Sequence, residues 1–298
     1  MDLLSSPTAL KRWTLASLVS NMLLIVTGGL VRVTQSGLGC STWPECEPGA
    51  YLPHPEAGAH AFIEFGNRLL TFVLVAVAIG TLVAAWQARD SGGRPRTRLR
   101  VLALCAAAGI PAQAIIGGFS VLTNLNPWVV GAHLLPSIAL IVVSVAMLHE
   151  AHGVRPDAKA SVPARRVALG VFVLGMVVMV LGAVVTGAGP NSGDGGAARN
   201  GLNLEAVARV HALSVWATVA GTVLLLVLTR GTIKAWRSTV ILLVVEILQG
   251  MIGYAQYVLS LPPALVVAHM AGTALFTAMI SHVLLVTRAA HPSSSPRP

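Results

Sequence analysis

Charged residues are scarce in this chain of 298 residues, where Asp, Glu, Lys and Arg together make up 10% and hydrophobic residues 55%. The mean hydropathy is +0.76. A soluble domain cannot bury so much apolar surface, so the composition excludes soluble proteins and indicates a lipid bilayer as the solvent. A membrane-crossing helix needs about 20 apolar residues. The apolar stretches predict an all-α integral membrane protein with eight transmembrane helices, at residues 12–33, 60–86, 100–122, 128–148, 167–187, 204–229, 238–259 and 265–287.

Acidic residues are especially few, 11 against 20 Lys and Arg, which gives a net charge of +9. Such an excess can indicate nucleic-acid binding, but its placement points elsewhere. In the eight-span arrangement sixteen basic residues fall on one side, and only four fall on the other: Arg32, Arg68, Arg199 and Arg209. This positive-inside pattern predicts a plasma-membrane protein with both termini in the cytoplasm and basic loops against anionic lipid, and no nucleic-acid partner.

Cysteine is also rare, with three in the chain. Cys40 and Cys46 share the loop after the first span, which the charge pattern places outside, where disulfides persist. We expect a Cys40–Cys46 disulfide, since two thiols alone do not favour a metal site. A redox-active pair is the alternative, because a bridge in a short exposed loop is more easily reduced. Cys105, in the third span, is expected to be a small buried residue.

One five-residue pattern occurs twice, 136 positions apart and with every spacing kept. Its copies are Gln113, Gly117, Leu125, Pro127 and His133, and Gln249, Gly253, Leu261, Pro263 and His269. The repeat indicates a duplicated protein that places one imidazole at the same depth in each half. Ionisable groups inside a membrane are costly, so a functional role is the first interpretation.

The polar segment 149–166 separates the two halves of the chain. We therefore predict an N-terminal four-helix bundle at 1–148 and a C-terminal four-helix bundle at 167–288, related by a pseudo-twofold and in parallel orientation. Such bundles commonly hold cofactors between facing helices. The Ser- and Pro-rich tail, 289–298, is predicted to be disordered.

His211 and His269 lie about seven and five residues into the sixth and eighth spans, counted from the outside. Two imidazoles at one depth on two helices of one bundle are typical of haem iron ligation. The alternative is a polar pair that is hydrogen-bonded between helices. The five other histidines outside the first-half cluster are expected not to be ligands: His54, His149, His152, His282 and His291.

The first half contains His133, but Asn67 stands at the position equivalent to His211. Asparagine is a poor iron ligand. His60, Glu64 and Asn67 share one helical face, because spacings of four and three stack on a helix. His60 is either an interfacial polar residue or a second ligand to the first-half iron.

Glu64 lies a turn inside a membrane helix, where a carboxylate needs a partner, a proton pathway or a catalytic role. It either pairs with Arg68, four residues on, or acts on a bound substrate as a proton shuttle or a stabiliser of positive charge. Glu246, deeper in the seventh span, pairs with a polar group or marks a proton route. Arg32 and Arg68, like Arg209, lie at outer helix ends, where cations either bind haem propionates or extend to lipid head groups.

These residues resemble the haem A synthase family over about residues 20–287. The likeness is carried by residues 28–46 (GGLVRVTQSGLGCSTWPEC), 63–70 (IEFGNRLL), 113–123 (QAIIGGFSVLT) and 187–194 (GAGPNSGD), and by the segments around His133, His211 and His269. The first loop and the Glu-x-x-x-Arg stretch are together fairly specific for the family.

The resemblance implies oxidation of the C8 methyl group of haem O to a formyl group, which gives haem A for terminal oxidases. It implies a haem b cofactor held by His211 and His269, and haem O as substrate in the first half with His133 near its iron. Glu64 matches the family's essential carboxylate, and Cys40 and Cys46 match its cysteine pair. Implied partners are membrane lipid, a haem O synthase and an electron donor, and a homo-oligomer stays open.

Asn67 departs from the family pattern, which usually has a histidine there, so the substrate iron has either one ligand or His60 as its second. The main alternative function is a di-haem b electron-transfer protein that oxidises quinol. That protein needs two permanent bis-histidine sites, and Asn67 counts against the second. A repeat-built transporter and a haem chaperone or sensor are further alternatives.

Overall fold

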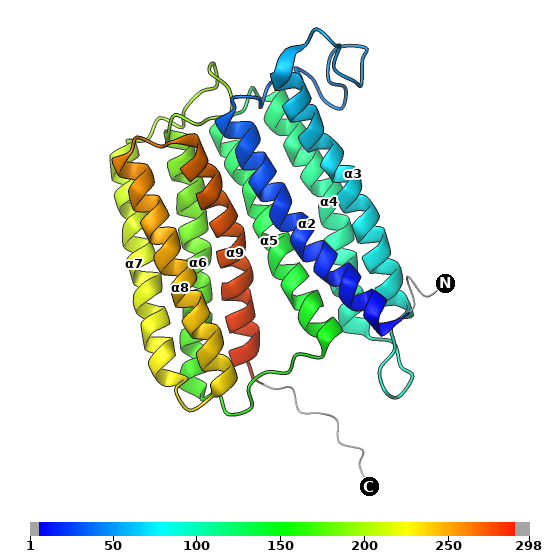
Figure 1. The fold of residues 1–298 in the computed structure, drawn as a ribbon, viewed down its shortest axis with the longest axis vertical. Coiled ribbons are helices and arrows are strands. Elements are labelled where there is room, and N and C mark those ends of the chain that lie inside the picture. Colours follow the sequence, from blue (N-terminus) through cyan, green and yellow to red (C-terminus); the bar gives the residue numbers. More distant parts are fainter. Residues whose placement is uncertain (1–5, 290–298) are drawn as a thin grey trace.

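The computed structural model describes residues 6–289, so His291 and the predicted tail beyond residue 289 lie outside the described part. The described segment folds into eight long α-helices (Figure 1). They are α2 (Pro7–Val33), α3 (Gly58–Gln87), α4 (Thr97–Leu122), α5 (Pro127–His152), α6 (Val162–Ala188), α7 (Leu204–Leu228), α8 (Ile233–Val258) and α9 (Pro263–Thr287). Each is long and apolar enough to cross a membrane, which confirms the prediction of an eight-span, multi-pass membrane protein.

Several helices begin about a turn earlier than predicted, at the end rich in basic residues. α2 starts at Pro7 and α6 at Val162, where the sequence predicted starts near 12 and 167. A serine precedes each helix: the side chains of Ser6 and Ser161 accept hydrogen bonds from Ala9 N and Ala164 N, at 3.0 and 3.3 Å. These N-caps extend the helices past the point at which apolar character fades.

The helices pack as two groups of four that lie side by side (Figure 1). In the first group α2 contacts α3, α3 contacts α4, α4 contacts α5, and α5 contacts α2. In the second group α6, α7, α8 and α9 close in the same order. The groups meet through the pairs α2–α9, α5–α9 and α5–α6. Exchange of the two groups leaves this set of contacts unchanged, as the pseudo-twofold would require, although the symmetry itself stays a prediction.

The largest buried core joins the two groups and is not confined to either. It includes Ile25 and Ile141 of the first group and Val171, Leu242 and Ile280 of the second. Residues 153–161 connect α5 to α6, so the link between the groups is shorter than the predicted linker. The halves therefore pack as one body through a shared apolar interface.

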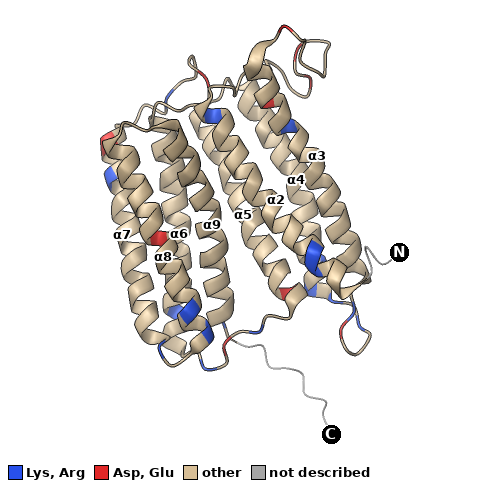
Figure 2. Ribbon diagram, in the orientation of Figure 1, with Lys and Arg blue, Asp and Glu red and all other residues tan. Residues whose placement is uncertain are grey.

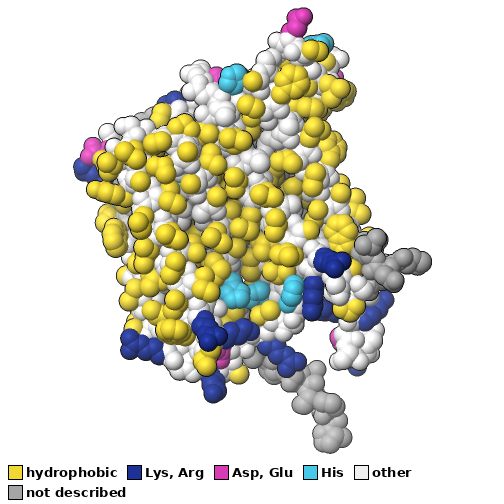
Figure 3. Space-filling view, in the orientation of Figure 1, with side chains coloured by type: hydrophobic (Ala, Val, Ile, Leu, Met, Phe, Trp, Pro, Cys, Tyr) yellow, Lys and Arg dark blue, Asp and Glu magenta, His cyan; other side chains and the backbone are white. Residues whose placement is uncertain are grey.

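Lys and Arg residues gather at the end of the molecule where α2 begins and α9 ends, which we call the basic end (Figure 2). The opposite end carries the Cys40–Cys46 loop, and we call it the disulfide end. Hydrophobic side chains cover the face between them (Figure 3), as expected for a surface in contact with lipid. Cys105 is among the exposed residues, so the prediction that it is buried was wrong: its position on α4 turns it away from the bundle.

Candidate functional site

Three histidines lie near the disulfide end, and each packs over a glycine of a neighbouring helix. His133 of α5 lies over Gly117, and His269 of α9 lies over Gly253; a Cβ built on these glycines would be 3.2 and 3.4 Å from the imidazole Cε1. His211 of α7 lies over Gly182 of α6 in the same way, at 3.3 Å. The glycines thus leave space for the rings, which explains the glycine in the repeated pattern. Gly182 belongs to neither copy of the pattern, so its role could not be predicted from the repeat.

The repeated glutamine holds the helix that carries each repeated histidine. Gln249 donates to the backbone oxygen of His269 at 3.1 Å. The terminal amide of Gln113 lies 3.2 Å from both the backbone oxygen and Nδ1 of His133. Gln249 therefore joins α8 to α9, and Gln113 joins α4 to α5, at the level of the imidazole.

The repeated leucine closes the turn before each of these helices. Leu125 and Leu261 both have positive φ, at 55° and 62°. Their backbone N–H groups donate to Ser120 O and Gln256 O at 2.7 and 2.8 Å, which caps the preceding helix. The prolines that follow stand at the start of α5 and α9, where a missing N–H costs nothing. The other four repeated residues thus serve to place the fifth, the histidine.

His211 and His269 are the candidate pair of iron ligands. Nδ1 of His211 lies 3.1 Å from Val178 O, so it carries the proton and leaves the Nε2 lone pair for a metal. Nδ1 of His269 is buried without a partner. No hydrogen bond joins these two described rings. The residues present fit a haem held between α7 and α9 better than a hydrogen-bonded polar pair.

The corresponding site in the first half is different. Asn67 of α3 accepts a hydrogen bond from the Thr27 hydroxyl of α2, at 2.8 Å. His60 is exposed and lies 2.9 Å from Ser36 Oγ of the outer loop. It is seven residues from Asn67, which is about 10 Å along a helix. No sequence pattern pointed to Thr27.

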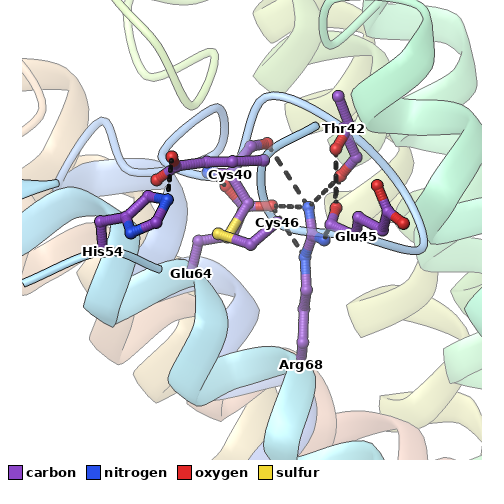
Figure 4. The surroundings of a disulfide bond; sticks show 8 residues. Cys40, Thr42, Glu45, Cys46, His54, Glu64 and Arg68 are labelled. Carbon is purple, nitrogen blue, oxygen red and sulfur yellow. Dashed lines mark hydrogen bonds and ion pairs between the residues drawn. A yellow bond between two sulfur atoms is a disulfide. The ribbon is translucent and has the colours of Figure 1, made fainter. Parts of the chain in front are cut away.

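Glu64 lies directly beneath the disulfide loop (Figure 4) and is 5% exposed. One carboxylate oxygen accepts from the Cys40 backbone N–H at 2.7 Å. The other is paired with Arg68, whose Nη2 and Nε lie at 2.5 and 3.1 Å. The ion pair with Arg68, which the sequence left as one alternative, is therefore present.

Arg68 also holds the loop itself. Its guanidinium donates to the backbone carbonyls of Thr42, Glu45 and Cys40, at 3.1, 3.3 and 3.4 Å (Figure 4). A positive charge shared between one carboxylate and three carbonyls fixes the loop to α3. Sequence spacing could predict the Glu64 pair but not these backbone contacts.

The disulfide between Cys40 and Cys46 is present, as predicted. Both cysteines are 0% exposed, so the expectation of an exposed bridge was wrong. The loop is pressed onto the bundle: a Cβ on Gly39 would collide with the His60 backbone, and one on Gly118 of α4 with the Trp43 ring. The loop thus covers the disulfide end of the first half.

Arg32 joins the two halves at this end. Its Nε and Nη2 donate to Asn191 O at 3.0 and 2.8 Å, in the loop between α6 and α7. Gly37 N donates to Gly193 O at 2.8 Å, so that loop is anchored. Arg209, by contrast, is exposed and pairs with Glu205.

Two polar groups lie farther toward the basic end. The Thr222 hydroxyl donates to Glu246 at 2.8 Å, and the second oxygen of Glu246 is buried without a partner.

His149 and His282, predicted not to be ligands, are joined by a 2.8 Å hydrogen bond, and Ser238 lies 3.0 Å from the second nitrogen of His282. His149 is buried where the sequence placed it in a polar linker, because α5 continues past it.

The sequence matches the COX15-CtaA family of cytochrome oxidase assembly proteins over residues 11–281. The chain belongs to this family. Relatives named "Heme A synthase" include those of Lysinibacillus sphaericus, 35% identical over 47% of this chain and 43% of the relative, and Exiguobacterium sibiricum, 28% identical over 55% and 54%. A relative in a Methylobacterium species is 28% identical over 49% and 41%. The matches thus span about half the length of these relatives.

Proposed function

We propose that this protein is a haem A synthase, an oxidoreductase that converts the C8 methyl group of haem O into the formyl group of haem A for terminal oxidases. The observation that carries the proposal is the difference between its two halves. One half has two histidines fit to hold an iron, and the other has one histidine and a buried carboxylate. An enzyme that keeps one haem and modifies another needs two such unlike sites. The family, and relatives named for this activity, support the same function.

In this proposal the second half holds haem b through His211 and His269. When bound, haem b supplies one-electron chemistry that side chains lack. The bond from His211 to Val178 orients one ligand, and Gln249 fixes the helix of the other. Hydrogen bonds made by the ligand residues to neighbouring protein groups fix the orientation of histidine rings in metal sites.

The first half takes haem O, with His133 as the ligand to its iron and Glu64 as the catalytic carboxylate. Glu64 is held by Arg68 and by the Cys40 amide, so its charge is fixed in place at the covered end of the bundle. There it stabilises positive charge that develops on the substrate and passes a proton. The disulfide loop excludes water from this site at the disulfide end.

The proposal places the protein in the plasma membrane with its basic end in the cytoplasm, since basic residues are retained on that side. A haem O synthase would supply the substrate within the same membrane. With dioxygen as the oxidant, each of the two successive hydroxylations at this carbon takes up two electrons and two protons and releases one water, so an electron donor is also needed. Loss of water from the second product leaves the formyl group.

The proposed function is tested by purifying the full chain from cells that make haem O and separating its extracted haems by chromatography and mass. We expect haem b together with haem O, its hydroxylated form or haem A. A Glu64→Gln variant should retain haem b and accumulate haem O. Two haem b per chain, unchanged in that variant, would instead support the di-haem quinol-oxidising protein.

A Gly253→Val substitution is expected to lower haem b content. Its side chain would overlap the His269 ring, which already lies 3.4 Å from a Cβ at this position. Overpacking of this kind costs about 1–3 kcal/mol, which corresponds to binding that is weaker by roughly fivefold to 150-fold. The measurement is haem b per protein by the pyridine haemochrome assay.

Gly250→Val is the matched control, since a Cβ on Gly250 of the same helix meets nothing within 4 Å. It carries the same helix-propensity cost without touching the imidazole. Equal haem b content in the two variants would contradict the role given to Gly253.

A further inference from the structure

Four helices contribute one polar residue each at the level of the two sites, and three of these residues are histidines. His133, His211 and His269 each lie against a glycine that makes room for the ring. The fourth is Asn67 of α3, the helix that takes in the first group the place of α7 in the second. The question is which chemical group the Asn67 side chain presents to the site in place of an imidazole.

Thr27 determines which end of the Asn67 amide is free. Its hydroxyl has one proton, and the nearest acceptor is Asn67 Oδ1 at 2.8 Å, against 3.2 Å for Leu24 O. The amide oxygen is therefore the end of Asn67 that accepts from Thr27, with one of its two lone pairs. Within the described residues Nδ2 has no hydrogen-bond partner. An amide nitrogen is a donor with no lone pair for a metal.

The space around Asn67 also differs from that around the histidines. A Cβ built on Gly28, next to Thr27 on α2, would meet nothing within 4 Å. The matching helix of the second group, α6, has the His211 ring against Gly182. Among the described residues no side chain therefore packs over Gly28, whereas an imidazole packs over Gly182.

We propose that the first-half site binds the substrate haem iron through His133 alone, and that Asn67 faces the other side of that iron as a hydrogen-bond donor. This inference rests on the proposed function and deepens it. The sixth position of the substrate iron is left open to a small ligand, which the Nδ2–H of Asn67 stabilises. Thr27 is a positioning residue, because it keeps the amide nitrogen turned toward the site.

His60 does not supply the missing ligand in this arrangement. It lies 2.9 Å from Ser36 Oγ and two helical turns farther out than Asn67. The Gly39 backbone packs directly on the His60 carbonyl, which holds this turn of α3 under the loop. Movement of His60 to the iron would require the loop to leave.

A single ligand also suits a site whose haem must depart after reaction. Each protein–iron bond adds to the barrier for release, so the half that retains its haem has two histidines and the half that exchanges it has one. The asymmetry of the residues therefore matches the asymmetry of the task.

The test uses the full chain purified with haem b and haem O, reduced and exposed to carbon monoxide. Haem b, held by two histidines, should not react and serves as the internal sign that each variant is folded. We expect one carbon monoxide per chain, bound to haem O. Asn67→Leu, of similar volume without a donor, should still bind it but with a higher C–O stretching frequency. Asn67→His should abolish the binding by filling the sixth position.

Thr27→Val should shift or split the C–O band, because it frees the amide to rotate, and Thr27→Ser should restore it. The inference is overturned if haem O in the unaltered protein is low-spin and does not bind carbon monoxide. Carbon monoxide binding that appears in His60→Ala would then identify His60 as the second ligand. An unchanged C–O band in Asn67→Leu overturns the donor role. Absence of haem O from a chain that retains haem b overturns both the site and the inference.

These outcomes are separable from the fate of the proposed function. Formation of haem A by a protein whose substrate iron is six-coordinate removes the inference and leaves the function. A five-coordinate haem O that responds to Asn67 but is never oxidised removes the function and leaves the inference.

Discussion

A His269→Ala protein is expected to lose essentially all of its haem b. His269 is one of two imidazoles that would share the iron, and Gln249, Gly253 and the capped turn at Leu261 all serve to place it. Apart from His211, no described histidine of the second group lies at this level, since His282 is near the basic end and bonded to His149. The measurement is haem b per chain in purified protein, with the redox spectrum of any haem that remains.

His54→Ala is the control, because His54 is an exposed loop residue whose ring lies 3.6 Å from Glu47. It should retain haem b fully. His211→Ala should behave as His269→Ala does. A His269→Ala protein that keeps one haem b with a bis-histidine spectrum would disprove the assignment of the ligand pair, and with it the division of roles between the halves.

Arg68→Ala is expected to detach the disulfide loop and abolish haem A formation. The substitution removes the partner of Glu64 and the donor to three loop carbonyls. Loss of one member of a buried ion pair costs about 3–5 kcal/mol, and Arg68 retains some exposure, so we take the lower value. Loop opening should then be roughly a hundredfold more frequent. The rate at which Cys40 and Cys46 are reduced and alkylated by impermeant reagents reports this opening.

Arg209→Ala is a closely matched control. Arg209 pairs with Glu205 at the same spacing and on α7, the counterpart of α3, but both side chains are exposed. An exposed pair contributes about 0–1 kcal/mol, so neither labelling nor haem A formation should change. Arg68→Lys should resemble Arg68→Ala, because a lysine cannot reach the carboxylate and the carbonyls together. Alkylation of Arg68→Ala at the unaltered rate would show that the disulfide and Trp43 hold the loop without Arg68.

Much of the architecture follows from composition and spacing. A membrane protein must satisfy its backbone within each helix, so long apolar runs predict helices directly. The eight spans, the basic end, the Cys40–Cys46 bridge and the repeated placement of His133 and His269 were all readable in this way. The predicted helix starts at the basic end were too late, because the apolar runs begin several residues after the N-caps Ser6 and Ser161.

The sequence by itself determined which residues are costly in a membrane: Glu64, Glu246, Asn67 and the paired histidines. Only the tertiary structure decided what each of them meets. Glu64 lies under a loop amide, Asn67 against Thr27, and Cys105 faces outward, because partners on other helices depend on rotation and depth that local periodicity does not specify. Helix identity is a local property of the chain, whereas the orientation of an amide or a guanidinium is set by neighbours distant in sequence.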